Sequence, residues 1–213
     1  MGSLLGQRSY HLAAVTATEN PYSQGDHWIN GGTTGLDWQD VQSAPGLIFG
    51  TGTSPAPPYN DPTAILAGLW GKVQTVEATV TVPASPSGSQ EVELRLLSAV
   101  GAHINTGYEV LFSVTSNPYV AIEVWHSGTD TSTFTEIALA SGPQLVTGYR
   151  VKASVSAAGL IKAYVDSGGG YSSICSATDT TYVTGAPGLG FFQSGSTAAM
   201  SAFGFSAFTA RSA

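Results

Sequence analysis

The segments VQTVEATVTV (73–82) and EVELRLL (91–97), separated by the turn PASPSGSQ, decide the fold. In each segment apolar and polar residues alternate strictly. The apolar positions are Val76, Ala78, Val80 and Val82 in the first segment, and Val92, Leu94 and Leu96 in the second. Successive side chains of a strand point to opposite faces, so a period of two predicts strands with one apolar and one polar face.

The same alternation recurs along the rest of the chain, punctuated by Gly, Pro, Asn and Ser. It predicts strands at 107–114, 119–126, 134–139, 149–155 and 160–166, and two more near the C-terminus. The apolar run PTAILAGLW (62–70) fits either a helical turn or a strand, and we favour a strand. Short strands at turn-length spacing predict an all-β fold, an antiparallel two-sheet β-sandwich. We expect one domain over residues 1–213, with an irregular segment (about 1–60) wrapping the sandwich.

Composition narrows the classes of partner. Only 10% of the residues are charged, and seven Lys and Arg against fourteen Asp and Glu give a net charge of −7. Nucleic-acid binding needs cations that displace counterions from phosphates, so neither nucleic acid nor an anionic membrane is an expected partner. A single cysteine, Cys175, excludes an intrachain disulfide and a cysteine-built zinc site. The N-terminal residues show no signal-peptide pattern.

The C-terminal part resembles a known superfamily. The strand KAYVD, followed by TDTTYVTGAPGLGFF and FGFSAF, is similar to the late strands of concanavalin A-like (laminin G-like) jelly rolls. The opening ENPYSQGDHWINGG, with YNDPTAIL and QEVELRLL, resembles a loosely characterised bacterial and phage branch of that superfamily. The resemblance implies a jelly roll and includes lectins, carbohydrate-binding modules, glucanases, polysaccharide lyases and virion proteins, so it leaves the activity open.

The catalytic motifs of the superfamily do not occur in this sequence. Its glucanases carry a Glu-x-Asp-x-x-Glu strand, and the nearest match here is EVELR, with Glu91 and Glu93 on one strand face. Of the three alginate-lyase motifs only the ELR of this strand resembles one. An enzyme is therefore the less favoured hypothesis. The alternative interpretation of EVELR is a solubilising Glu–Arg ladder on an exposed sheet face.

A polar face shared by neighbouring strands is the candidate ligand site. Its residues are Glu93, Arg95, Glu109, Glu123 and Trp125, with Trp28 or Trp38 from the first 60 residues at the rim. Carboxylates beside an exposed aromatic ring suit sugar recognition, because they accept hydroxyl hydrogen bonds next to a flat apolar surface. We expect Arg95 to pair with Glu93 or Glu109 and to hold that carboxylate ionised. An ordinary polar sheet face is the alternative.

Calcium is the one cofactor that the sequence suggests. Asp26, Asp37 and Asp61 lie in Gly- and Pro-rich loops, where oxygen ligands for calcium gather. Asx turns are the alternative explanation for aspartates in such loops.

Three functions remain open at this point. The first is a non-catalytic carbohydrate-binding or adhesion module that recognises a neutral polysaccharide or glycan. The second is a structural capsid or tail decoration protein whose partners are other virion or surface proteins. The third is a polysaccharide-degrading hydrolase or lyase of the same fold. We expect an extracellular or virion-surface location.

Overall fold

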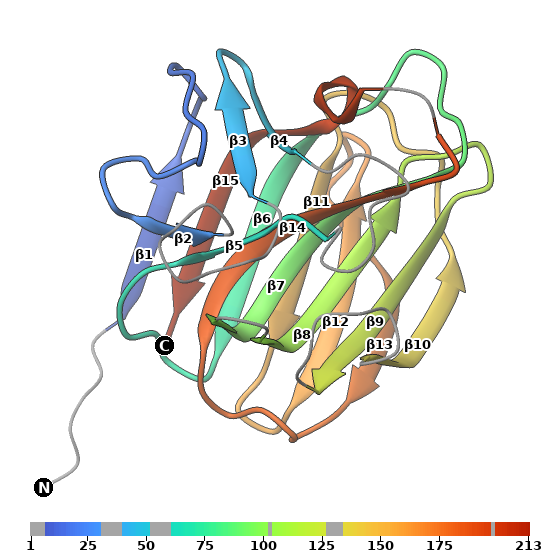
Figure 1. Cartoon of the computed structure of the whole chain (residues 1–213). Helices are drawn as coiled ribbons and strands as arrows, with labels where there is room; N and C mark the ends of the chain where they lie inside the picture. Colours follow the sequence, from blue (N-terminus) through green and yellow to red (C-terminus); the bar gives the residue numbers. More distant parts are fainter. Residues whose placement is uncertain (1–6, 31–39, 52–60, 102–103, 127–133, 197–198) are drawn as a thin grey trace, which may run out of the picture.

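The computed structural model describes residues 7–30, 40–51, 61–101, 104–126, 134–196 and 199–213. These residues form two antiparallel sheets and one short 3₁₀ turn, η1 (Met200–Ala202) (Figure 1). The all-β, two-sheet sandwich predicted from the alternating segments is therefore confirmed.

The first sheet has eight strands, in the order β13-β12-β11-β6-β15-β4-β3, with β1 paired to β15. Their bounds are β1 (Arg8–Leu12), β3 (Val41–Ala44), β4 (Leu47–Gly50), β6 (Gln74–Thr81), β11 (Arg150–Val155), β12 (Leu160–Asp166), β13 (Tyr171–Thr178) and β15 (Gly204–Ser212).

The second sheet has seven strands, in the order β10-β9-β8-β7-β14-β5-β2. Their bounds are β2 (Trp28–Asn30), β5 (Thr63–Leu66), β7 (Ser89–Gly101), β8 (Ile104–Ser113), β9 (Tyr119–His126), β10 (Phe134–Ser141) and β14 (Ala186–Ser194). The two segments that decide the fold, β6 and β7, belong to different sheets, so the turn between them carries the chain across the sandwich.

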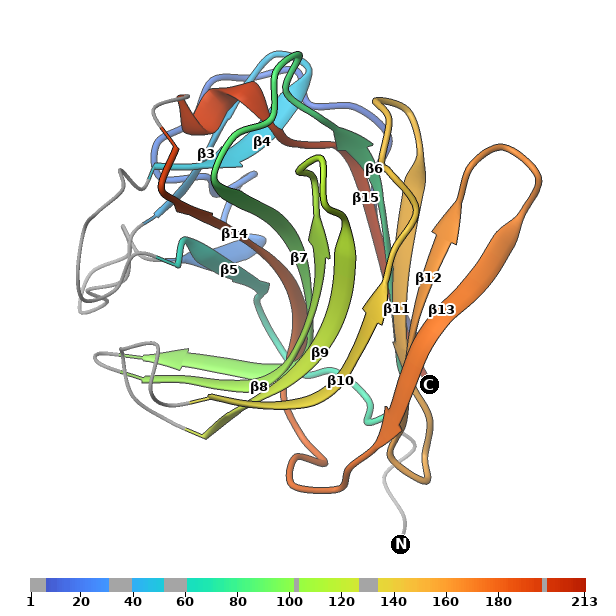
Figure 2. The same ribbon diagram turned by 90° about the vertical axis from the view of Figure 1, so that its right-hand side faces the viewer.

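The seven-stranded sheet is strongly curved. Seen edge-on, its convex side packs on the eight-stranded sheet and its hollow side faces away from that sheet (Figure 2). The two faces of each central strand therefore serve different purposes: one face makes the core and the other lines a hollow.

Val82, the last apolar position of the first alternating segment, is only partly buried against the core between the sheets. The core itself contains the apolar residues that alternation assigns to the central strands. Every one is at most 4% exposed and belongs to one contiguous apolar cluster: Val92, Leu94, Leu96, Val110, Ile122, Val124, Val151 and Val165. Trp28 and Trp70 are buried in the same cluster. The expectation that Trp28 forms the rim of a ligand site is therefore wrong.

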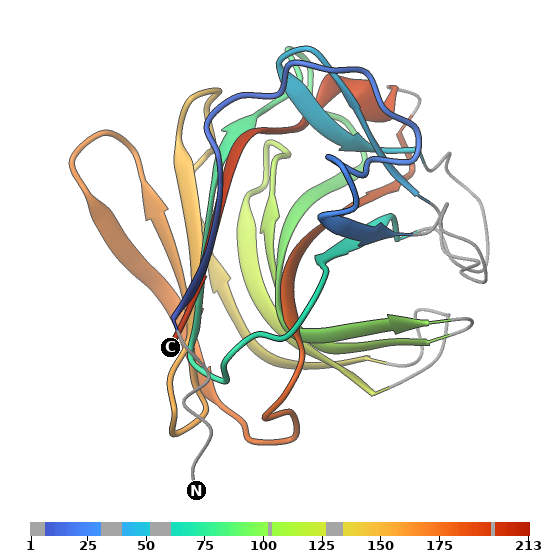
Figure 3. The same ribbon diagram turned by 90° about the vertical axis from the view of Figure 1, so that its left-hand side faces the viewer.

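The N-terminal segment is more regular than expected. It contributes the short strands β1 to β4, which extend both sheets (Figure 3). The favoured strand in 62–70 is present as β5, whereas β13 was not predicted, because YSSICSAT lacks an alternating apolar set. Among the described residues no helix is long and apolar enough to cross a membrane.

The first prediction concerns the core. Ile122→Ala should lower the free energy of unfolding by about 2–5 kcal/mol, because it removes buried methylene groups and leaves a cavity. Leu69→Ala is the control, since Leu69 is 80% exposed, and it should change stability by less than about 0.5 kcal/mol. Urea unfolding measures both, and equal effects of the two substitutions would contradict the assigned core.

Candidate functional site

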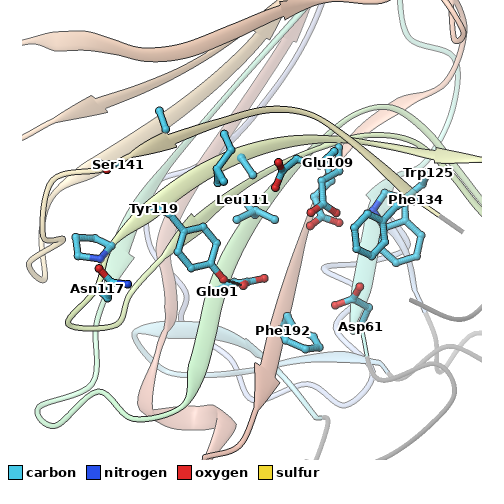
Figure 4. Close-up of a pocket in the computed structure, with 16 residues that line it drawn as sticks. Asp61, Glu91, Glu109, Leu111, Asn117, Tyr119, Trp125, Phe134, Ser141 and Phe192 are labelled. Carbon is cyan, nitrogen blue, oxygen red and sulfur yellow. Dashed lines mark hydrogen bonds between the residues drawn. The ribbon is translucent and has the colours of Figure 1, made fainter. Parts of the chain in front are cut away.

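A pocket of about 770 Å³ lies on the hollow face of the seven-stranded sheet. Strands β7, β8, β9, β10 and β14 supply most of its lining, and Asp61 enters from the segment before β5. The carboxyl groups of Asp61, Glu91 and Glu109 point into the same space, between Tyr119 on one side and Trp125 with Phe134 on the other (Figure 4).

A row of charged residues crosses four adjacent strands beneath this pocket. The register places Arg95 of β7 opposite Glu109 of β8, Glu109 opposite Glu123 of β9, and Glu123 opposite Glu136 of β10. Like charges directly opposite each other destabilise an antiparallel pair. Three consecutive glutamates in one row are therefore an arrangement that sheet stability alone does not favour.

The Arg95 guanidinium is the centre of this row. Its Nη2 atom lies 2.9 Å from Glu93 Oε2 and 2.6 Å from Glu109 Oε2, and it donates to Thr63 Oγ1 at 3.3 Å. Arg95 is 1% exposed and Glu93 is fully buried. The predicted pairing of Arg95 is confirmed with both carboxylates, and the interpretation of EVELR as an exposed solubilising ladder is wrong.

Gly190 leaves the space that the Glu93 side chain occupies. It stands opposite Glu93 on the neighbouring strand β14, and a Cβ atom at this position would lie 2.2 Å from Glu93 Oε2. The glycine thus lets a long acidic side chain lie flat across the sheet, within reach of Arg95.

Asp61 completes a compact acidic group. One oxygen atom each of Asp61, Glu93 and Glu109 lie within 4.8 Å of one another. Asp61 Oδ1 and Glu93 Oε1 are buried without a hydrogen-bond partner among the described residues. Such oxygen atoms suit a hard cation such as calcium, although Arg95 already supplies a positive charge to Glu93 and Glu109.

The three aspartates suggested as calcium ligands do not form a cluster in the described structure. Asp26 lies in an exposed turn, where its backbone N–H donates to Ser23 Oγ at 2.9 Å, and it is not part of the acidic group around Asp61. Asp37 and Trp38 lie outside the described residues. The acceptor of this backbone N–H is the Ser23 hydroxyl and not the Asp26 carboxylate, so the bond is not that of an Asx turn. Asp61 belongs to the pocket.

Burial raises the pKa of every carboxyl in the group. Desolvation is the main cause for each, and the Glu109 charge adds to it for Asp61, Glu93 and Glu123. Desolvation also raises the pKa of Glu109, although Arg95 opposes this rise. The pKa of Glu91 rises to about 7 and that of Glu123 to about 9. The expectation that Arg95 simply holds its partners ionised is wrong, because one guanidinium does not compensate for so many buried carboxyls.

Aromatic side chains flank the acidic group. The rings of Trp125 and Phe134 lie 5.4 Å apart between centroids, and the Arg95 guanidinium lies 5.1 Å from the centroid of Trp125. Tyr119 donates its hydroxyl to Glu91. Trp125 lines the pocket but is only 2% exposed, so the expected open stacking surface is supplied more fully by the half-buried Phe134.

The sequence predicts which sheet face carries the pocket, but it identifies only some of the residues that line it. Glu93, Arg95, Glu109, Glu123 and Trp125 do lie together, as alternation predicts. The lining residues that the prediction of the face omitted include Glu91, Tyr119, Phe134, Glu136 and Phe192. Alternation places Glu91 with Glu93, Tyr119 with Glu123 and Phe134 with Glu136, so this signal was sufficient to find four of these five.

The described residues form an antiparallel two-sheet β-sandwich with a pocket on the hollow face of one sheet. The chain is similar to the carbohydrate-binding module CBM66 from Bacillus subtilis, with 15% identity over 90% of this chain and 95% of that one, at a TM-score of 0.56. It is also similar to the exoplasmic/lumenal domain of VIP36 in a Ca²⁺/Man₃GlcNAc-bound form, with 11% identity, coverage of 89% and 85%, and a TM-score of 0.60.

A third similar structure is the lectin from Bauhinia forficata in complex with GalNAc. It shares 8% identity over 97% of this chain and 98% of that one, at a TM-score of 0.59. At these identities the likeness establishes the fold, which is consistent with the concanavalin A-like jelly roll. No family model matches the sequence, and no curated protein matches it.

The second prediction follows from the raised pKa values. The folded protein holds protons on Glu91 and Glu123 above pH 4.5, the ordinary pKa of Glu, so it binds more protons there than the unfolded chain. This contribution to stability is complete below about pH 4.5 and is lost as the pH rises through about 7 and about 9. The melting temperature should therefore decrease as the pH rises from about 4.5 to about 9. Glu91→Gln and Glu123→Gln should each make this decrease smaller.

Asp166→Asn is the control for this experiment. The pKa of Asp166 is lowered by the backbone N–H of Gly168 and by Arg150, so the substitution should act equally at every pH in the window. Thermal unfolding followed by circular dichroism from pH 5 to pH 9 gives the profiles of the original protein and of the three variants. A stability that rises with pH over this range would contradict the assignment.

Proposed function

We propose that the protein is a non-catalytic carbohydrate-binding module whose ligand enters the pocket on the hollow sheet face. The observation that carries the proposal is the combination of a 770 Å³ hollow with buried carboxyl groups and flanking aromatic rings. Binding pockets typically combine an apolar surface with a few fixed polar groups that orient the ligand.

Each part of the pocket has a counterpart on a sugar ring. Hydroxyl groups of a sugar donate to carboxylate oxygens and accept from protonated carboxyls, and Glu91 and Glu123 supply both forms near neutral pH because of their raised pKa values. The C–H face of a pyranose ring is apolar and suits the half-buried ring of Phe134. Tyr119 fixes the orientation of the Glu91 carboxyl by its hydrogen bond.

The energetic cost of the acidic row supports a role beyond stability. Burial of a charged or polar group costs free energy unless a partner compensates for it, and replacement of a buried ion pair by apolar residues is often neutral or stabilising. Here Glu109 and Glu123 stand directly opposite each other and are 2% and 7% exposed. Side chains that weaken a sheet in this way are expected where function requires them.

Solved structures with a similar fold support the proposal of a glycan ligand. Two of them have sugars in their descriptions, Man₃GlcNAc for VIP36 and GalNAc for the Bauhinia forficata lectin, and a third is a carbohydrate-binding module. We propose a glycan as the partner here and an extracellular or virion-surface setting. We also propose that the ligand is bound without cleavage, because the sequence lacks the glucanase and lyase motifs of the resembled superfamily.

The third prediction tests the pocket. Phe134→Ala and Glu123→Ala should each weaken oligosaccharide binding at least tenfold, because one removes the apolar surface and the other removes a carboxyl group that bonds sugar hydroxyls. Tyr164→Ala is the matched control, since Tyr164 is also a half-buried aromatic but lies on β12 of the other sheet, and it should leave the affinity unchanged. A glycan array selects the oligosaccharide, and isothermal titration calorimetry measures the affinity.

Two results would contradict the proposed function. If both pocket variants bind the selected oligosaccharide as tightly as the original protein, the ligand binds elsewhere. If the oligosaccharide is recovered with new reducing ends or unsaturated ends, and Glu123→Gln abolishes their release, the protein is an enzyme.

A further inference from the structure

We propose that this pocket selects glycans that carry a primary ammonium group, such as de-N-acetylated amino-sugar oligomers, and rejects uronate-containing ones. The inference rests on the proposed function and specifies its ligand class. It is argued from the distribution of charge, from the state of each carboxyl group and from the geometry of the pocket.

The charges of the protein are divided between its two sheets. Among the seven Lys and Arg residues, five stand on strands of the eight-stranded sheet and one lies in the connection before β6. These six are Arg8, Lys72, Arg150, Lys152, Lys162 and Arg211. Arg95 alone lies on the seven-stranded sheet, so the hollow face has one fixed cation.

That cation does not serve the ligand side of the pocket. Arg95 is not among the residues that line it, and its Nη2 atom is engaged by Glu93, Glu109 and Thr63. Five lining residues are acidic, and none of the described lining residues is Lys, Arg or His. The acidic lining residues are Asp61, Glu91, Glu109, Glu123 and Glu136.

Asp61 shows most directly that the pocket is short of a positive partner. Its side chain lines the pocket and the residue is 7% exposed, yet Oδ1 has no N–H or hydroxyl donor within the described structure, and the hydrogen-bonding neighbour of its carboxyl is Glu93, a second acid. Buried polar groups are normally satisfied, so an unsatisfied carboxylate oxygen at a binding pocket indicates a missing donor. Glu123 also lines the pocket, directly opposite Glu109 in the acidic row.

An ammonium group on a sugar would supply the positive charge and the hydrogen-bond donors that the acidic lining residues lack. It is a compact charge with three hydrogen-bond donors, enough to contact several carboxyls at once. The rings of Trp125 and Phe134 beside the carboxyls attract a cation through their faces. A neutral sugar supplies hydroxyl donors but no charge, and a uronate would add another carboxylate to the group.

Binding of a cation should also displace protons. The groups that face the pocket or support it are Asp61, Glu91, Glu93, Arg95, Glu109, Tyr119, Glu123 and Glu136. Burial raises the pKa of Glu91 and Glu123, so these carboxyls are partly protonated near neutral pH. An ammonium ion favours their ionised forms, so its binding releases protons and strengthens as the pH rises, as long as the amine stays charged.

The fourth prediction compares matched oligosaccharides by isothermal titration calorimetry. The probes are a glucosamine tetrasaccharide, its fully N-acetylated counterpart, cellotetraose and tetragalacturonate, at ~0.15 M salt with EDTA present. The glucosamine probe should bind at least tenfold more tightly than the N-acetylated one, and tetragalacturonate should not bind. Titration in two buffers of different ionisation enthalpy should show that glucosamine binding releases protons.

Variants separate the pocket from general attraction to an acidic protein. Asp61→Asn and Glu136→Gln should each reduce the preference for the amine at least threefold, and Glu136 is exposed, so its variant retains the fold. Glu77→Gln is the control, because it removes the same charge from β6 of the other sheet and should change nothing.

The possible failures are distinguishable. Equal affinity for the glucosamine and N-acetylated probes, weakened alike by Phe134→Ala, would overturn the amine inference and keep the proposed function. Amine binding that disappears at high salt and responds equally to Glu77→Gln and Glu136→Gln would overturn the inference as non-specific attraction. Absence of binding by all four probes and by every oligosaccharide of the array would overturn both.

Discussion

The concave face depends on one interaction, the sharing of the buried Arg95 guanidinium between Glu93 and Glu109. A buried carboxylate is costly, and a paired cation is the ordinary compensation. Because Arg95 lies at the end of the row that continues through Glu123 and Glu136, its positive charge compensates only the nearest members. Burial raises the pKa of every carboxyl in the group, including the two that Arg95 contacts, and the Glu109 charge adds to the rise for Asp61, Glu93 and Glu123. The pocket is therefore polar, acidic and short of cations.

The architecture offsets the destabilising effect of the acidic row on the fold. Each central strand of the curved sheet uses one face for the apolar core, where Leu94 and Ile122 are fully buried, and the other for the pocket. Because core and pocket residues alternate along each strand, the buried carboxyls lie on the face opposite the core and do not disturb the packing between the sheets. Gly190 adds the local space for Glu93, and the bend of the sheet brings side chains from β7 to β10 around one hollow.

The sequence predicts the fold and the identity of the face well, for a physical reason. Period-two alternation is local, and it assigns Glu109 and Glu123 to the face opposite the core without knowledge of their neighbours. The strand β13 has no such pattern, and its pairing is set by its neighbour β12. Register, curvature and depth are non-local, so alternation did not reveal that Glu93 and Arg95 are buried or that Asp61 enters the group from a segment before β5. Spacing along the loops likewise did not reveal that Asp26 lies in an exposed turn while Asp61 lines the pocket.

The central claim is that burial, with repulsion between neighbouring acids, keeps protons on the carboxyls of the hollow face, and that a cationic ligand takes the place of those protons. Carboxyl ¹³C chemical shifts of Glu and Asp, followed by NMR as a function of pH in the free protein and with saturating glucosamine tetrasaccharide, test it most directly. The account predicts midpoints at about 7 for Glu91 and about 9 for Glu123 in the free protein, and lower midpoints for both in the complex. Midpoints near 4.5, the ordinary value for Glu, in the free protein would contradict it.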